Sequence, residues 1–459
     1  MRTYAARLAA FVRHADANEL ACLFQEHVRW PERYASKRSR LYTMPHTFWL
    51  FLGQVLTTGA SCHEVVARFL GRLAVAGLHA STNNAAYCAA RKRLPQEALD
   101  HVLNEVTRET HAQGCDSKLL WCGRCVKVVD GSSVSMPDTS ANQAKYPQPT
   151  VQKPGCGFPV MRLTVMFCLA TGVVLDVAKA ALTVSERALF RDLWDGLKKG
   201  DVVLTDRGFC SYAEMYMLRQ RGVDCVMRKH QRRGKTSLVQ KRLAKNDALM
   251  VWIKTSARPE WLDAETWRAL PASMLVREVT VDIAIPGFRT QHVVIATTLL
   301  DSKTYRAQAF AELYRRRWNA ELYLRDLKTT MGMDVLRCKS PAMIHKEITM
   351  HFIAYNLLRT AMLHAALEHR RSPNDIGFKA SLATLRQWAP HFSYLRAKPR
   401  KRARLYRQLL QTLARNLVHR RPDRVEPRAK KRRPKNYQLL TKPRRQFNEI
   451  PHRNQYHAP

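Results

Sequence analysis

Two aspartates follow short runs of β-type residues and could hold divalent cations. Asp130 follows the run Val126–Val129 and Asp206 follows the run Val202–Thr205, with a glycine within two residues of each. A sheet fixes the direction of its strand ends, and hard cations prefer carboxylate oxygens and water. Two such cations roughly 3.5–4 Å apart are what phosphoryl transfer on DNA requires. Each aspartate alone is better explained as a turn residue, because Asp before Gly is a common turn pattern.

A third carboxylate, Glu321, lies in a long helix predicted from about Thr304 to Met331. Four side chains in it have two, three and six residues between successive members: Tyr314, Arg317, Glu321 and Lys328. At roughly 100° per residue they fall within about 60° of one another and form one stripe. The alternative is a solvated helix face on which Arg317 and Glu321 pair at i,i+4. That alternative explains the charges but not Tyr314, nor Trp318 beside them.

Other titratable groups are weaker candidates. Asp138 and Asp201 could replace the first two aspartates, but both lie on the wrong side of a strand. Asp326 and Asp334 lie off the stripe that contains Tyr314. The stripe residues and the two aspartates therefore remain the preferred set.

The 11 cysteines are odd in number and scattered, which indicates a reducing cytoplasm. Cys122-Gly-Arg-Cys125 is a lone CxxC motif. A zinc site needs four ligands, and no second pair of cysteines has a suitable spacing. We therefore predict free thiols beside a strand.

The charge of the chain indicates a nucleic-acid partner. Lys and Arg number 77 against 37 Asp and Glu, a formal net charge of +40. Each Lys or Arg placed against a phosphate releases a condensed counterion, so a polyanion is the natural partner. The longest apolar run, Leu163–Leu175, is well short of the ~20 residues of a membrane-spanning helix. We expect no membrane partner and no signal peptide.

The order of predicted elements indicates an α/β fold. Residues 1–118 read as a helical N-terminal domain, in which the basic helix Asn83–Leu94 is equally consistent with DNA binding and with packing. Residues 119–345 read as three strands, a helix, a strand, a helix and a strand, which is an RNase H-like order. A largely β insertion at about 229–290 interrupts it. Residues 346–459 read as helical and then as a basic tail, for which phosphate contact is the better interpretation.

The pattern Tyr314-x2-Arg317-x3-Glu321-x6-Lys328 resembles the signature of the DDE transposases of the insertion-sequence-four family. The local motifs Val129-Asp130-Gly131-Ser132 and Thr205-Asp206-Arg207-Gly208-Phe209 are similar to that family's first and second acidic motifs. The insertion and the basic C-terminal end are also similar. The resemblance covers roughly residues 50–440.

The resemblance implies a catalytic RNase H-like core in which Asp130, Asp206 and Glu321 bind two Mg²⁺ or Mn²⁺ ions. It implies cut-and-paste transposition of an insertion sequence: water cuts the DNA at the element end, and the freed 3′ hydroxyl attacks a second strand. Tyr314, Arg317 and Lys328 would then hold phosphates. The expected partners are double-stranded DNA, as terminal inverted repeats and target, and a second copy of the chain in a synaptic homodimer. The expected location is the bacterial cytoplasm, on the nucleoid.

Four tryptophans bear on how the DNA end would be held. Trp318 could stack near the terminal base pair, and helix packing explains it equally well. Relatives use an aromatic residue of the insertion to stabilise a flipped base, but we predict core positions for Trp252, Trp261 and Trp267. Two rival hypotheses remain: an RNase H-like nuclease without strand transfer, and a domesticated DNA-binding repressor.

Overall fold

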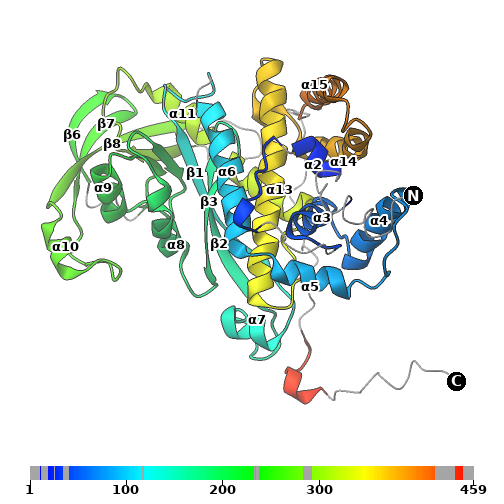
Figure 1. The fold of residues 1–459 in the computed structure, drawn as a ribbon. Coiled ribbons are helices and arrows are strands. Elements are labelled where there is room, and N and C mark those ends of the chain that lie inside the picture. Colours follow the sequence, from blue (N-terminus) through cyan, green and yellow to red (C-terminus); the bar gives the residue numbers. More distant parts are fainter. Residues whose placement is uncertain are drawn as a thin grey trace.

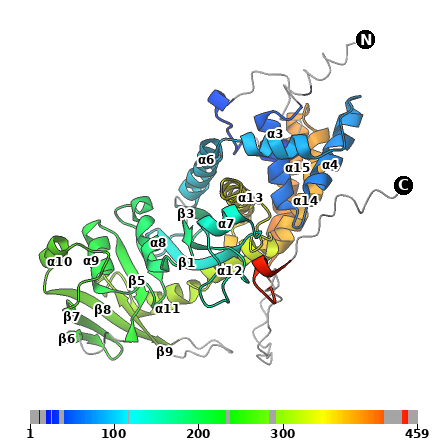
Figure 2. The ribbon, with the colours of Figure 1, turned by 90° about the horizontal axis from the view of Figure 1, so that it is seen from below.

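The computed structural model describes residues 11, 19–24, 26–34, 41–115, 118–231, 233, 237–282, 292–418 and 440–447. They form a mixed α/β molecule built on one nine-stranded sheet, with the strand order β3-β2-β1-β4-β5-β9-β8-β7-β6. Figures 1 and 2 show helices on both faces of this sheet and a further helical group beyond α13. The basic stretch Ala429–Lys435 and the motif Arg424–Arg428 lie outside the described residues.

The sheet combines two kinds of pairing. Strands β2 and β3 pair antiparallel to their neighbours, whereas β4 and β5 run parallel to β1. The strands are β1 (Val126–Ser135), β2 (Val160–Cys168), β3 (Val174–Ala181), β4 (Val202–Thr205), β5 (Asp224–Arg228), β6 (Ser237–Ala244), β7 (Asp247–Ile253), β8 (Ser273–Asp282) and β9 (His292–Thr297). The predicted hairpin turn at Thr171-Gly172 is confirmed: Gly172 has a φ of 77°, a conformation that glycine adopts at no steric cost.

The predicted insertion is β-rich, but it continues the central sheet. Its last strand, β9, pairs antiparallel with β5, and β8, β7 and β6 follow outward in turn. Strand β6 was not predicted from the sequence, because most of its side chains are exposed and polar. The insertion therefore shares one hydrogen-bonded sheet with the strands that carry Asp130 and Asp206.

One long central helix, α13, packs against helices from both ends of the chain: α3, α6, α7, α14 and α15, with the short turns η5 and η6. The helices are α2 (Glu19–Phe24), η2 (Glu32–Tyr34), α3 (Met44–Leu56), α4 (Cys62–Val75), α5 (Ala85–Arg93), α6 (Gln96–Cys115), α7 (Ser140–Lys145), α8 (Glu186–Asp192), η3 (Trp194–Gly196), α9 (Tyr212–Gln220), α10 (Ala264–Ala269), α11 (Ala307–Arg316), α12 (Asn319–Arg325), η5 (Asp326–Thr330), α13 (Pro341–Glu368), η6 (Pro373–Asp375), α14 (Phe378–Tyr394), α15 (Pro399–Arg415) and η7 (Arg444–Gln446). Pro341 begins α13 at a position where its missing N–H costs no hydrogen bond. Residues on every side of α13 are buried, as expected for a helix that is apolar all round.

Two hydrophobic clusters lie on opposite faces of the sheet. The larger joins alternate residues of β1 and β4, such as Val128 and Leu204, to α12, η5 and α13. The smaller joins the intervening residues, such as Val129 and Val203, to α8 and α9. Because side chains alternate along a strand, the same strands supply both clusters. Among the described residues, no helix has the length and apolar character needed to cross a bilayer.

Two expectations about the helical ends need correction. The expected boundary at residue 345 falls inside α13, which begins at Pro341. The first part of the predicted basic tail is instead an amphipathic helix, α15, which buries Leu409, Leu410 and Leu413.

The basic helix α5 is only partly available to a ligand. Arg91 is buried against Phe51, with its Nη atoms 3.0 Å from the sulfurs of Cys62 and Cys338. Packing thus accounts for Arg91, while Lys92 and Arg93 are exposed.

Candidate active site

Asp130 lies within a strand, and this overturns the expectation that the strand ends there. Strand β1 continues to Ser135, and Asp130 is paired with Val165 of β2. The glycine that follows therefore makes no sharp turn. A Cβ atom at Gly131 would lie 2.3 Å from the carboxyl carbon of Glu186 in α8, so the glycine leaves room for that side chain. The long ladder with β2 overrides the local turn signal of Asp-Gly.

Asp206 lies beside Asp130 at the same level of the sheet. Val128 of β1 is in register with Leu204 of β4, and each aspartate comes two residues later in its strand direction. Neighbouring strands are about 4.8 Å apart, and residues two apart point to the same face. Asp206 follows β4 in a turn, as predicted, and its Oδ1 accepts a 2.7 Å hydrogen bond from the N–H of Gly208. Both carboxylates therefore point to the face that α12 covers.

The helix with Glu321 is not the single regular helix that we predicted. It consists of α11, α12 and the π-helical turn η5. Between α11 and α12 the hydrogen bonds tighten to i→i−3, as from Glu321 N to Trp318 O (3.1 Å). In η5 they widen, as from Met331 N to Asp326 O (3.0 Å). The helix is therefore overwound between α11 and α12 and underwound in η5. The two changes offset each other, so Arg317, Glu321 and Lys328 share one face although the helix is irregular.

The three carboxylates share one electrostatic environment. The pKa of Asp130 is raised to about 6, chiefly by burial and to a smaller extent by the negative charges of Glu321 and Asp206. A hydrogen bond from the N–H of Gly131 and the positive charge of Arg317 oppose this rise. A partly buried carboxylate beside two others is a costly arrangement without a cation. The charges of Glu321 and Asp206 both act on Asp130, so these carboxylates lie near it; their joint binding of metal stays a prediction.

Arg317 pairs with Glu321, so the contact expected on the simpler interpretation is present. Arg317 Nη2 lies 3.0 Å from Glu321 Oε1, with the two side chains 17% and 37% exposed. The guanidinium also lies 5.7 Å from the centroid of the Tyr314 ring. Arg317 also lies close enough to Asp130 for its positive charge to lower the pKa of that carboxyl. A solvated helix face alone does not explain this position.

The remaining members of the stripe differ in accessibility. Tyr314 is only 7% exposed and belongs to the larger core cluster, which leaves little of its surface for DNA. Lys328 Nζ lies 3.0 Å from the hydroxyl of Ser132, two residues beyond Asp130 on β1. Trp318 is 41% exposed. Stacking on DNA and helix packing explained this residue equally well from the sequence, and its exposure now makes packing the weaker explanation.

Arg228 is a site residue that sequence reasoning missed. It ends β5, where Thr205 of β4 is in register with Met227, so Arg228 comes level with Asp206. Its positive charge lowers the pKa of Tyr314, although burial of that phenol is the larger effect and raises it. The signal available in the sequence was its place at the end of a third short apolar run.

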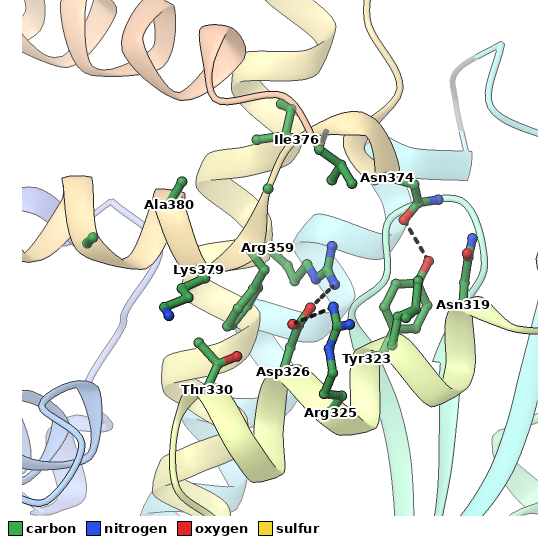
Figure 3. A pocket seen from close by; sticks show the side chains of 15 residues that line it. Asn319, Tyr323, Arg325, Asp326, Thr330, Arg359, Asn374, Ile376, Lys379 and Ala380 are labelled. Atoms are coloured by element: carbon green, nitrogen blue, oxygen red, sulfur yellow. Dashed lines mark hydrogen bonds and ion pairs between the residues drawn. The ribbon is translucent and has the colours of Figure 1, made fainter. Parts of the chain in front are cut away.

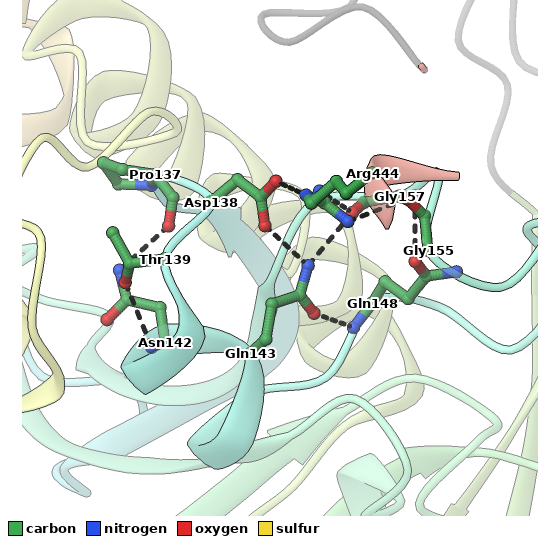
Figure 4. A network of polar contacts seen from close by, with 9 residues as sticks. All are labelled: Pro137, Asp138, Thr139, Asn142, Gln143, Gln148, Gly155, Gly157 and Arg444. Carbon is green, nitrogen blue, oxygen red and sulfur yellow. Dashed lines mark hydrogen bonds and ion pairs between the residues drawn. The ribbon is translucent and has the colours of Figure 1, made fainter. Parts of the chain in front are cut away.

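Both alternative aspartates have other partners. Asp201 immediately precedes β4, at the opposite end from Asp206, and is 2.6 Å from the buried ammonium of Lys127. Asp138 is held by Arg444 and by Gln143, whose Nε2 lies 2.9 Å from its Oδ1 (Figure 4). The prediction that neither belongs to the preferred set agrees with these contacts.

A cavity of about 630 Å³ lies on the other side of α12 and η5, against α13 and α14. Figure 3 shows Asp326 in it, with its carboxylate 3.3 Å from Arg359. The Tyr323 hydroxyl donates to Asn374 Oδ1 at 2.7 Å. None of the predicted metal ligands lines this cavity, and Asp326 lies off the stripe, as expected.

The tryptophans of the insertion occupy the core positions predicted for them. Trp252 is fully buried and donates from Nε1 to Glu278 Oε1 at 2.7 Å. Trp267 is buried in a small cluster beside α9. Trp261 is partly buried and packs edge-on against Trp194.

Comparisons with known proteins agree with this geometry. The family model described as "Transposase DDE domain" matches residues 121–357, more than half of the chain. The transposase InsG for insertion sequence element IS4 of Escherichia coli (strain K12) is 26% identical over 350 residues, which cover 75% of each protein. A solved piggyBac transposase synaptic complex with hairpin DNA is similar at a TM-score of 0.42 and 10% identity, covering 89% of this chain and 88% of that one. That last likeness is too distant to support a conclusion.

The family match spans every residue of the candidate site. Asp130, Asp206 and Glu321 all lie inside residues 121–357, as do the stripe residues around Glu321. Enzymes of this family generally depend on divalent metal ions, and carboxylates are suitable ligands for them. The chain is therefore a DNA transposase and belongs to the DDE transposases of the insertion-sequence-four family.

Proposed function

We propose that this transposase moves an insertion sequence by cut-and-paste chemistry on an RNase H-like core. Hydrolysis would cut the DNA at the element ends, and the released 3′ hydroxyl would attack a second strand. The order β3-β2-β1-β4-β5, in which only β2 runs antiparallel to the other four strands, supports such a core. The observation that carries the proposal is the level placement of Asp130 and Asp206 on adjacent strands, with the charge of Glu321 acting on Asp130.

Asp130, Asp206 and Glu321 would hold two divalent cations, Mg²⁺ or Mn²⁺. Their oxygens suit hard cations, and burial, the main cause of the raised pKa of Asp130, makes a counter-charge beside its ionised form favourable. The cations, when bound, supply activation of the attacking oxygen and stabilisation of the leaving oxygen. The Arg317–Glu321 ion pair occupies Glu321 in the protein alone. Arg317 would then be released to a phosphate when the site is loaded.

The basic and aromatic residues around Glu321 would position the DNA end. Arg317 and Lys328 lie on the carboxylate side of the helix and would contact phosphates of the strand being cut. Tyr314 would mainly support Arg317, against whose guanidinium its ring lies, with at most a limited contact to phosphate. Trp318 would stack near the terminal base pair, because its ring is exposed beside Arg317.

The expected partners follow from the reaction. The chain would bind terminal inverted repeats and target DNA, and two copies would join two ends in a synaptic homodimer. The net charge of +40 supports extensive phosphate contact. The DNA substrate would place the protein on a bacterial nucleoid. The division into residues 1–118, 119–345 and 346–459 is proposed with one change: α13 crosses the last boundary.

The test is a strand-transfer assay with purified full-length protein, a precut element end and Mg²⁺. We expect joined products from the wild type. Glu321→Gln should keep end binding and abolish both cleavage and joining. Glu312→Gln is the matched control, since Glu312 is an exposed glutamate of α11 in the same helical region.

The two rival functions predict other results. A nuclease would hydrolyse the end without a joined product, and a DNA-binding repressor would bind the end without cutting it. Cleavage that survives Glu321→Gln would show that the site assignment is wrong.

A further inference from the structure

One histidine and three cysteines gather at the start of β1, away from the carboxylates. His111 and Cys115 lie one turn apart at the end of α6, so they share a face of that helix. Cys125 immediately precedes β1, and Cys168 is the last residue of β2. The ligand atoms of His111, Cys115 and Cys125 all lie within 4.8 Å of one another.

The separations match the edges of a tetrahedral metal site. The sulfurs of Cys115 and Cys125 are 3.5 Å apart, and His111 Nε2 lies 3.6 Å and 3.8 Å from them. A zinc ion about 2.3 Å from sulfur and about 2.0–2.1 Å from nitrogen has ligand–ligand edges of about 3.5–3.8 Å. These three atoms therefore already have the spacing of three corners of one coordination sphere.

Cys168 is the candidate for the fourth corner, beside the three residues whose ligand atoms lie within 4.8 Å of one another. Its side chain is fully buried and hydrogen-bonds to both Cys125 and His111. All 11 cysteines of the chain are described and free, so none of these sulfurs is engaged in a disulfide. Three sulfurs and one imidazole nitrogen form a donor set typical of structural zinc sites.

The backbone is shaped so that these four residues meet. Cys122 and Gly123 both have positive φ values, 46° and 71°, in a tight turn closed by the pair Trp121 and Arg124. That turn leads the chain back to Cys125, whose sulfur lies beside α6. An L-residue seldom adopts positive φ, so the surroundings must hold Cys122 in this conformation.

A second close approach brings the end of β2 to α6. A Cβ atom at Gly114 would lie 2.1 Å from Cγ2 of Thr171, in the β2–β3 turn. Only glycine lets the turn pack this tightly against the helix. Cys168 lies three residues before Thr171, so the same contact brings the end of β2 towards α6.

We propose that His111, Cys115, Cys125 and Cys168 form a structural zinc site that fastens α6 to the start of β1 and the end of β2. Four protein ligands leave no open position, so this site holds the fold and takes no part in the reaction. Thiolates favour zinc, whereas the carboxylates at Asp130 favour Mg²⁺ or Mn²⁺. The two metal sites therefore differ in ligand chemistry as well as in place.

The cluster borders one of the cavities of the structure. A cavity of about 690 Å³, lined by His111, Cys115 and Cys125 among others, gives an ion a path to the site.

The sequence could not predict this site from spacing. The lone Cys122-x2-Cys125 motif contributes only Cys125, because Cys122 is exposed in the turn and lies outside the cluster. The other ligands come from a helix and a second strand. We expected free thiols because the sequence has no second pair of cysteines with a suitable spacing. A site assembled from one helix and two strands shows no such pair.

The test measures metal in purified full-length protein with any affinity tag removed. Mass spectrometry of the metal content should give about one zinc ion per chain after dialysis. Exchange with Co²⁺ should give the visible absorption of tetrahedral cobalt thiolate. Cys125→Ser and His111→Ala should lose the zinc and the cobalt signal, whereas Cys122→Ser, in the same turn, should keep both.

Two further variants keep the proposal falsifiable if the first ones fold poorly. His111→Cys preserves four ligands and should retain zinc, and Glu321→Gln should retain it because Glu321 belongs to the other site. Wild-type protein without zinc or a cobalt signal would overturn the proposal. So would loss of zinc in Cys122→Ser equal to that in Cys125→Ser, or a Cys115–Cys125 disulfide in the protein purified without reductant.

Discussion

Replacing Asp130 with asparagine should stabilise the protein while removing its activity. Burial and two neighbouring carboxylates raise the pKa of Asp130 from 3.8 to about 6. The folded protein therefore disfavours the ionised form that is present at neutral pH. The asparagine side chain would keep the shape and could still accept the hydrogen bond from Gly131 N–H, but it carries no charge.

The size of the effect follows from the change in proton affinity. Each tenfold change in the acid dissociation constant is worth about 1.4 kcal/mol. Ionised Asp130 therefore lowers the free energy of unfolding at neutral pH by up to about 3 kcal/mol. Below about pH 4 the carboxyl is protonated in both folded and unfolded chains and the cost vanishes. As the pH rises, the unfolded chain loses its proton first, and stability falls until the pH passes about 6. Asp130→Asn should therefore gain most above that pH.

Thermal unfolding of both proteins between about pH 4.5 and about pH 8 measures this difference. We expect the Tm of Asp130→Asn to exceed that of the wild type by a few degrees at about pH 7.5, and the gap to close toward the acidic end. Added Mg²⁺ should raise the Tm of the wild type and have little effect on the variant. A variant that is less stable than the wild type at neutral pH, or a gap that does not change with pH, would refute the reasoning.

Asp201→Asn is the matched control, with the opposite sign. Asp201 is paired at 2.6 Å with Lys127, and both side chains are buried. Removing one partner leaves the ammonium of Lys127 without its counter-charge, which typically costs about 3–5 kcal/mol. The two Asp→Asn changes thus separate a carboxylate that we propose acts in catalysis from one that stabilises the fold.

Three further predictions test other contacts. Gly114→Ala should destabilise the protein by about 1–3 kcal/mol in chemical denaturation, because its Cβ meets Thr171 Cγ2, and Gly114→Ala combined with Thr171→Ser, which removes that methyl group, should restore the stability. Trp318→Ala should leave the Tm almost unchanged but weaken binding of an element end by about tenfold, since base stacking is worth about 1–3 kcal/mol; equal binding would favour a packing role. Lys328→Met should reduce the slope of log K against log salt by about one in a binding titration, and an unchanged slope would show that Lys328 contacts no phosphate.

The sequence predicted which helices and strands carry the site residues better than it predicted the exact backbone path of those elements. A helix carrying Glu321 was predictable from its charged and aromatic pattern, but its tightening at Trp318 and widening in η5 were not. Those irregularities depend on how Arg317 and Lys328 meet β1, and residue spacing along a regular helix contains no information on that. The stripe residues still lie on one side of the helix because the tightened turn at Trp318 and the widened turn in η5 offset each other.

The nearby glycines predicted a turn at both aspartates. This prediction is wrong at Asp130 and confirmed at Asp206. Both are followed by glycine, yet β1 continues through Asp130 because β2 pairs with it as far as Ser135. Beyond β4 no such partner holds the chain among the described strands, and the turn at Asp206 forms. Tertiary pairing decided between two segments that look alike in sequence.

Strand β1 explains why the costly carboxylate can persist. Its start lies beside His111 and Cys115 of α6 and is hydrogen-bonded on both edges, by β2 and β4. Strand β2 stays paired with it as far as Ser135, and Ser132 contacts Lys328. A strand held along its whole length cannot shift to relieve the repulsion at Asp130. The rigid scaffold therefore keeps Asp130 and Asp206 at one level before any ligand arrives, which is the preorganisation that phosphoryl transfer on DNA requires.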